Sequence, residues 1–213
     1  CVEIESLSLE LSNKNIVEGD RVATILPNSA EYIISYFSNN FIGAINVPID
    51  YNSTNLTIDY IIRNCGVSCI ITDESKYKDI SNSLKYTDIL IVVFKRNQTR
   101  DLVISGKTGK KHSNSSDNIK NVSLVVYTTG TTGEKKGVML TDSAVLNATK
   151  AINEVMKISK EPVELLAMPL SRSFGLARMR CTFMMNGTVV LSKGLLNPAI
   201  FIKQLMDHNV DVF

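Results

Sequence analysis

Short apolar runs alternate along the chain with segments that have a helical hydrophobic period. Runs rich in Val and Ile predict strands at residues 21–26, 44–47, 68–72, 88–94, 122–127, 138–140, 163–168 and 188–191. The helical period predicts helices at residues 56–64, 141–158 and 174–185, one after Asn28 and one from Asn197. Strands that alternate with helices are typical of an α/β fold with mostly parallel sheets. We therefore expect stacked αβα layers.

Helix starts are marked by capping residues. Asn28, with Glu31 three residues later, has the spacing of a capping box, and Thr141 is a second expected cap. Pro198 suits the first position of the last helix. In the helix after Asn28, five apolar residues are expected to share one buried face: Tyr32, Ile33, Tyr36, Phe37 and Phe41.

Residues 96–121 interrupt this alternation. They contain four lysines, two glycines and a polar run at 113–118, with little hydrophobic pattern. No aromatic residue is interleaved with the lysines, so a solvated face is favoured over a surface that stacks nucleic-acid bases. We expect a polar surface connection.

Composition excludes several classes of protein. The 213 residues are 44% hydrophobic and 21% charged, which is typical of a globular chain. The net charge of +2 is far from that of a dedicated nucleic-acid binder, and no apolar run approaches the ~18 residues of a membrane span. The four cysteines lack paired CxxC spacing, which favours free thiols over a metal site. We expect a cytoplasmic protein.

The candidate chemistry lies in residues 127–137, which read Tyr-Thr-Thr-Gly-Thr-Thr-Gly-Glu-Lys-Lys-Gly directly after a predicted buried strand. Gly130 and Gly133 allow backbone N–H groups to converge on an anion, while threonine hydroxyls and lysine charges add donors. This composition predicts a polyphosphate-binding loop. The spacing excludes a Walker A loop, and an ordinary turn after a strand is the alternative.

This loop resembles the signature of the adenylate-forming (AMP-binding) superfamily, which includes acyl-CoA synthetases, adenylation domains of peptide synthetases and luciferases. Thr129 stands where the family usually has Ser, and Lys135 stands where it usually has Pro. Further segments match the family in the same order, at residues 19–22, 26–29, 43–48, 168–176 and 187–190. The matches run from about residue 17 to residue 213.

The resemblance implies a two-step reaction that uses ATP and Mg²⁺. A carboxylate forms an acyl-adenylate with release of pyrophosphate, and a thiol of CoA or of the phosphopantetheine on an acyl carrier protein then takes the acyl group. The implied phosphate-binding residues are Thr128, Thr129, Gly130, Thr131, Thr132, Gly133 and Lys136, with Lys136 also catalytic. It implies that residues 1–213 are the N-terminal portion of one adenylate-forming domain. The family's later elements would follow Phe213, so we expect these residues alone to be incomplete for catalysis.

The substrate side is implied by a second segment of the same resemblance. Peptide-synthetase domains place an Asp where this chain has Phe174, and a Phe cannot neutralise the ammonium of an amino acid. Phe174 with Gly175 resembles fatty- and aryl-acid ligases, which often carry His in place of Arg172. We expect Arg172, Phe174 and Gly175 to contact a fatty or aryl acid. An amino-acid-activating domain and a non-catalytic nucleotide-binding domain remain alternatives.

One helix carries two further arginines. Arg178 and Arg180 are two residues apart, on different faces of the expected helix, and at least one is expected to face solvent.

Overall fold

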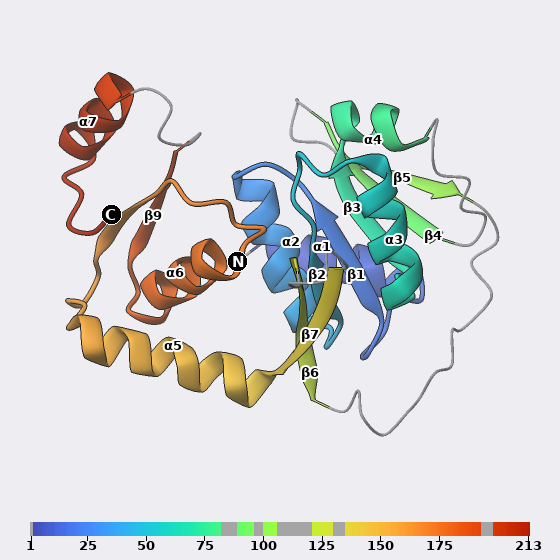
Figure 1. Cartoon of the computed structure of the whole chain (residues 1–213), viewed down its shortest axis with the longest axis horizontal. Coiled ribbons are helices and arrows are strands. Elements are labelled where there is room, and N and C mark those ends of the chain that lie inside the picture. The colour runs from blue at the N-terminus through green and yellow to red at the C-terminus, as the bar shows by residue number, and fades with distance from the viewer. Residues whose placement is uncertain (1, 82–88, 96–99, 106–120, 130–134, 193–197) are drawn as a thin grey trace. The chain divides into compact units, whose positions relative to one another are not determined.

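A computed structural model describes residues 2–81, 89–95, 100–105, 121–129, 135–192 and 198–213. The chain divides into two compact units (Figure 1). The first contains residues 1–26 and 30–141, and the second contains residues 27–29 and 142–213.

The first unit is built on a seven-stranded sheet with the strand order β5-β4-β3-β1-β2-β6-β7. Its strands are β1 (Arg21–Ile25), β2 (Ile45–Pro48), β3 (Cys69–Asp73), β4 (Ile89–Phe94), β5 (Arg100–Ser105), β6 (Val122–Thr129) and β7 (Lys135–Thr141). Its described helices are α1 (Val2–Asn13), α2 (Ala30–Phe41), α3 (Asn55–Cys65) and α4 (Glu74–Ser81). The five central strands are parallel, and β5 and β7 pair antiparallel at the two edges.

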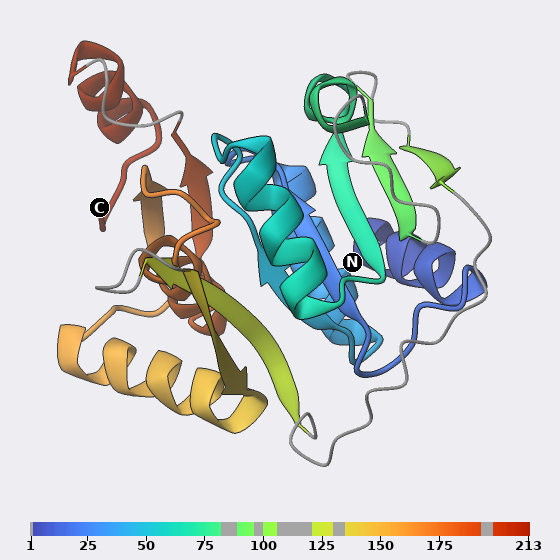
Figure 2. The ribbon, with the colours of Figure 1, turned by 45° about the vertical axis from the view of Figure 1, so that its right-hand side comes forward.

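Helices cover both faces of this sheet, as expected for stacked αβα layers. Figure 2 shows α3 in front of the sheet and α1 and α2 behind it. On the α3 side, Ile58, Ile61 and Ile62 pack with alternate residues of the strands, such as Ile70 and Val125. Because side chains alternate along a strand, the residues between them face α1 and α2. Strands β1 to β4 are therefore buried on both faces, which explains their nearly continuous apolar sequences, whereas β7 at the edge is mostly exposed.

The second unit contains a two-stranded parallel sheet with three helices. Its strands are β8 (Val163–Leu166) and β9 (Thr188–Leu191), and its helices are α5 (Asp142–Met156), α6 (Ser173–Met184) and α7 (Pro198–Asp207). Val212 forms an isolated parallel bridge with Glu164 of β8. The last helix begins at Pro198, as the sequence predicts.

Most predicted elements are confirmed, but residues 96–121 are not wholly a surface connection. β5 lies within them and pairs antiparallel with β4. The sequence pattern also missed α1 and α4. α1 buries Leu7, Ser8 and Leu11, a narrow face that includes a polar residue, and Ser38 of α2 donates a hydrogen bond to the Ile4 carbonyl. Because a polar residue stands at one of its buried positions, the sequence of α1 lacks the strong apolar period by which helices are recognised.

Two predictions about α2, the helix after Asn28, also differ from the structure. The Asn28 side chain donates to the Met168 carbonyl at 2.9 Å and accepts from the Leu170 N–H at 2.8 Å, so the turn before α6 occupies both of its polar ends. Phe41 is 70% exposed, and the buried face of α2 carries Ser35, Ser38 and Asn39 beside its two tyrosines instead. The expected roles of Asn28 and Phe41 were therefore wrong.

Among the described residues, none of the helices combines the length and the apolar character that crossing a membrane requires.

Candidate active site

The described part of the candidate phosphate-binding segment is the end of β6 and the start of β7, which pair antiparallel. In their register Thr128 lies opposite Lys136, and Thr129 lies opposite Lys135. Side chains of directly opposite residues share one face of a sheet. The Thr128 hydroxyl and the Lys136 ammonium thus belong to the same face of the β6–β7 hairpin, and both residues are exposed.

The opposite face of the hairpin carries Tyr127. Its register partner is Gly137, where a Cβ atom would lie 3.1 Å from Cζ of Tyr127. The tyrosine ring therefore lies across the glycine, in space that a larger residue would restrict. Because Val125 of this same face packs in the α3-side core, Tyr127 lies on the side of the sheet that α3 covers.

Two side chains of α3 form hydrogen bonds to this hairpin. The Tyr60 hydroxyl donates to the Lys135 carbonyl at 2.9 Å, and the Tyr127 hydroxyl donates to Oδ1 of Asn64 at 2.6 Å. The rings of Tyr60 and Tyr127 also meet edge to face, with centroids 6.4 Å apart. Helix α3 therefore forms one side-chain hydrogen bond with β6 and one with β7.

Burial dominates the protonation of this cluster. It raises the pKa of Tyr127 above the ordinary tyrosine value, and the neighbouring Cys65 thiol raises it further. Burial likewise raises the pKa of the Cys65 thiol, although Tyr127 and Arg21 oppose that shift. Both groups are therefore neutral near pH 7, and Tyr127 keeps the proton that it donates to Asn64.

Four predicted phosphate-binding residues, Gly130, Thr131, Thr132 and Gly133, lie outside the described residues. Thr129 is described as the last residue of β6. The geometric description of the predicted loop therefore rests on Thr128, Lys136 and their backbone pairing.

The predicted substrate residues lie in the second unit, at the start of α6. Arg172 is the residue before the helix, with its N–H bonded to the Pro169 carbonyl at 3.0 Å, and its side chain is exposed. Phe174 is 60% exposed in the first turn. Gly175 is buried against the preceding turn, where a Cβ would lie only 2.3 Å from the Pro169 carbonyl oxygen.

Sequence reasoning missed a buried charged cluster that joins β8 to α6. Arg178 donates to both carboxylate oxygens of Glu164, at 2.8 and 2.9 Å, and the Thr182 hydroxyl donates to the same carboxylate. The two charged side chains are 5% and 3% exposed. Arg180 is half-buried, so only this one of the two arginines is partly open to solvent. A Glu inside an otherwise apolar strand was the available signal.

Thr128 and Lys136 are the described polar side chains of the predicted phosphate-binding loop. A hydroxyl donor beside an ammonium group fits a phosphate oxygen. Within the described ranges, no three His, Cys, Asp or Glu residues gather as possible metal ligands. Mg²⁺ commonly binds through substrate phosphates and one or two carboxylates, so this arrangement is compatible with a metal carried by a nucleotide.

Comparison with known proteins decides the family. The model of the AMP-binding enzyme family matches residues 3–213, which is nearly the whole chain. The chain belongs to the AMP-binding enzyme family. The resemblance carried by the Tyr127–Gly137 segment and the collinear motifs is thereby confirmed.

Two relatives illustrate the range of this AMP-binding family. The chain is 23% identical to 4-coumarate–CoA ligase 1 of Petroselinum crispum over 209 residues, which cover 95% of this chain and 38% of the ligase. It is 26% identical over 189 residues to hybrid PKS-NRPS synthetase 1 of Dothistroma septosporum, covering 88% of this chain and 4% of that protein. This chain thus spans less than two fifths of the length of either relative.

Solved structures show the same fold. The O-succinylbenzoate coenzyme A synthetase of Bacillus subtilis, in complex with ATP and magnesium ion, matches with a TM-score of 0.77 at 17% identity, over 99% of this chain and 54% of that one. A long-chain-fatty-acid-CoA ligase from Archaeoglobus fulgidus matches with a TM-score of 0.79 at 19% identity, over 98% and 42%. The fold is therefore that of the N-terminal domains of adenylate-forming enzymes.

Proposed function

We propose that the protein carrying this chain is an AMP-forming acid–thiol ligase. In the first step a carboxylate oxygen of the acid bonds to the α-phosphorus of ATP, and the bond from that phosphorus to the bridging oxygen breaks to release pyrophosphate. In the second step the sulfur of CoA or of a carrier-protein phosphopantetheine bonds to the acyl carbon. The thiol loses its proton, and AMP leaves.

The observation that carries the proposal is the pairing of Thr128 with Lys136 in a member of the AMP-binding family. The hydroxyl and the ammonium project from one face of the hairpin, beside the segment with the family's phosphate signature. They can hold the β- and γ-phosphates in the ground state and stay with the pyrophosphate as it departs. Stabilising charge that develops in the transition state is what accelerates the reaction.

Lys136 has the main electrostatic role in this proposal. Its ammonium follows the negative charge that moves onto the leaving pyrophosphate, while Thr128 and the predicted Thr129–Gly133 segment add neutral donors. Mg²⁺, when bound, would neutralise phosphate charge and polarise the phosphoryl oxygens. No described residue is assigned as its ligand.

A fatty or aryl acid is the substrate class that we propose. Phe174 stands at the start of α6, at the position where an amino-acid-activating domain would need a carboxylate. Phe174 offers no counter-charge to the ammonium group of an amino acid. Arg172, Phe174 and Gly175 are the substrate residues of the proposal, and the role assigned to the Arg172 charge is to attract a carboxylate.

A peptide-synthetase adenylation domain is the second candidate, because one relative is a hybrid PKS-NRPS synthetase. It would activate an amino acid by the same first step. A screen over fatty, aryl and amino acids separates the two candidates. Exchange of pyrophosphate that depends only on an amino acid would favour the second.

The proposal predicts that removing the phosphate-binding side chains slows adenylation. In the complete protein, Lys136→Ala combined with Thr131→Ala should lower acid-dependent ATP–pyrophosphate exchange by about a hundredfold, since losing one preorganised electrostatic donor commonly costs that much. The measurement is the rate of exchange of labelled pyrophosphate into ATP, with folding checked by circular dichroism.

Lys135→Ala is the matched control, because it removes the same charge one residue away, on the other face of the strand. Its effect should be at least about ten times smaller than that of Lys136→Ala. Equal effects of the two changes would contradict the assignment of Lys136. An unaltered exchange rate in the double variant would contradict the phosphate assignment altogether.

The same proposal makes residues 1–213 the N-terminal portion of one adenylate-forming domain, incomplete for catalysis alone. The 54% of the Bacillus subtilis synthetase that this chain covers supports it. Exchange by the 213-residue chain alone would contradict the second part. The cytoplasmic location stays a prediction.

A further inference from the structure

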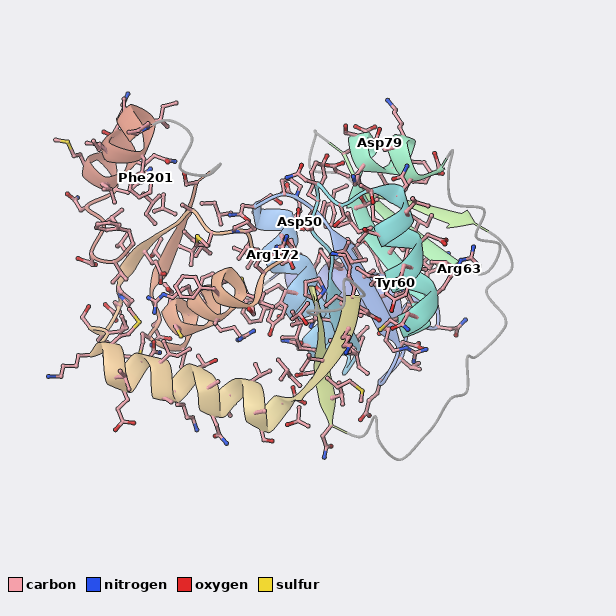
Figure 3. All side chains as sticks on the ribbon, viewed as in Figure 1. Asp50, Tyr60, Arg63, Asp79, Arg172 and Phe201 are labelled. Carbon is pink, nitrogen blue, oxygen red and sulfur yellow. The ribbon has the colours of Figure 1, made fainter. Side chains whose placement is uncertain are left out.

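One face of α3 reaches both strands of the β6–β7 hairpin. Tyr60 and Asn64 are four residues apart, and residues at that spacing lie one above the other on a helix. Tyr60 bonds to β7 through the Lys135 carbonyl, and Asn64 bonds to β6 through the Tyr127 hydroxyl. Figure 3 shows Tyr60 on α3 at the side of β7.

Each of these contacts is one residue away from a proposed phosphate-binding residue. Tyr127 precedes Thr128, and Lys135 precedes Lys136. Alternation along a strand sends the Tyr127 side chain toward α3 and the side chains of Thr128 and Lys136 to the other face, while Tyr60 reaches the backbone carbonyl of Lys135. The helix therefore fixes the backbone beneath the two side chains without occupying the face from which they project.

The helix is itself held firmly by the core. Ile58, Ile61 and Ile62 are at most 3% exposed and pack on the sheet. The Thr54 hydroxyl accepts from the Thr57 N–H at its start, and Gly66 at its end has a φ of 64° in the left-handed region. A packed and capped helix is a more precise support than a loop.

The hairpin needs such a support, because its link to the parallel strands is short. The register of β6 with β2 rests on a single pair, Asn46 with Leu124. The residues of β6 after Leu124 have β7 as their ladder partner, and β7 is the edge of the sheet in the described chain. Side-chain contacts from α3 are therefore well placed to fix the end of the hairpin.

We infer that Tyr60 and Asn64 are positioning residues for Thr128 and Lys136, an inference that rests on the proposed phosphate-binding role of that pair. They act on the ligand only through the hairpin backbone. The Tyr127 ring completes the arrangement, because it crosses Gly137 to reach Asn64 and meets Tyr60 edge to face.

The test uses variants that remove single polar groups. Tyr60→Phe removes one hydroxyl, and Asn64→Leu removes the acceptor while keeping a similar volume. Each should raise the KM for pyrophosphate in the exchange reaction by about fivefold, the equivalent of one ordinary hydrogen bond. The KM for the acid should stay unchanged. A merely structural role would lower the amount of folded enzyme and leave both KM values alone.

Two further variants sharpen this measurement. Asn64→Asp keeps an acceptor for Tyr127 and should restore the KM. Tyr77→Phe is the matched control, because Tyr77 packs on the same core and no hydrogen bond of its hydroxyl occurs in the part of the chain that the structure describes. Loss of the Tyr77 hydroxyl should leave the KM for pyrophosphate unchanged.

Amide hydrogen exchange tests the positioning without any activity. The combined Tyr60→Phe and Asn64→Leu changes should speed exchange in β6 and β7, by at least about fivefold, while β1 and β3 keep their protection. Unchanged exchange in the hairpin would overturn the inference even if the enzyme is active. In the complete protein, absent ATP–pyrophosphate exchange in the wild type, together with faster amide exchange of the hairpin in the variant, would instead refute the proposed function and leave the positioning supported.

Discussion

At Gly175 a single missing side chain decides how closely α6 approaches the turn before it. A Cβ there would lie 2.3 Å from the Pro169 carbonyl oxygen and 2.9 Å from that of Met168, closer than real atoms approach. Both neighbours are backbone atoms, so no side-chain rotation relieves the clash. Packing alone therefore requires glycine at position 175, whether or not a substrate contacts it.

Gly175→Ala is accordingly expected to destabilise the second unit by about 1 to 3 kcal/mol, the usual cost of overpacking. The measurement is the urea midpoint of the variant against that of wild type. Ser173→Ala, an exposed change in the same helical turn, serves as control and should shift the midpoint little. A Gly175→Ala protein as stable as the control would show that the helix can move away from the turn.

The Glu164–Arg178 pair acts at the scale of whole elements. It joins β8 to α6, and Nη1 of Arg178 also lies 3.0 Å from Sδ of Met156 at the end of α5. Removing one partner of a buried ion pair leaves the other charge unsolvated, whereas replacing both with apolar groups removes that cost.

We expect Arg178→Met alone to lower the free energy of unfolding by about 3 to 5 kcal/mol. The combined Glu164→Leu and Arg178→Met changes should recover most of that loss. A double-mutant cycle measured by chemical denaturation checks this expectation. Additive losses in the double variant would mean that the two side chains stabilise the unit independently of each other.

Elements were predictable where the apolar period was strong. The buried strands and the helices at 56–64 and 141–158 follow directly from their patterns, and Pro198 marks the start of the last helix. The β5 strand was not predictable in the same way, because it lies within a largely polar stretch and depends on pairing with β4. Whether such a segment forms a strand depends on its tertiary contacts more than on its intrinsic strand propensity.

The candidate site was predictable only in part. The phosphate segment was found because glycines, threonines and lysines follow a strand directly, and the family match was found because its motifs are collinear. The positions of Tyr60 and Asn64 beside the hairpin were not predictable, because they depend on how α3 lies on the sheet. Hydrogen bonds between residues 63 and 75 positions apart leave no local pattern.

At the scale of the whole molecule, buried thiols and phenols couple stability to alkaline pH. Burial raises the pKa of the Cys69 thiol far above its ordinary value, and burial also raises the pKa of Tyr32. Below the unfolded thiol pKa of about 8.5 both states keep the proton, so stability does not change. Above it the unfolded state releases the proton while the folded state retains it, so stability falls as pH rises.

The Cys69 contribution should cost about 1.4 kcal/mol of unfolding free energy at pH 9.5 relative to pH 7, from one pH unit above the unfolded pKa. Urea unfolding at several pH values between 7 and 10 measures it. Cys69→Val removes the titrating group and should make the alkaline decline shallower. An identical decline in both proteins would assign the pH dependence to other groups.

Because side chains alternate between the two faces of β7, its neighbouring residues Lys135 and Lys136 cannot substitute for each other. Lys136 shares a face with Thr128, while Lys135 points to the face that carries Tyr127. A one-residue slip would exchange the two lysines, but it would also move Gly137 from beneath the Tyr127 ring. The packing of Tyr127 on Gly137 thus favours one register of β6 with β7. That register places Lys136, and not Lys135, beside Thr128.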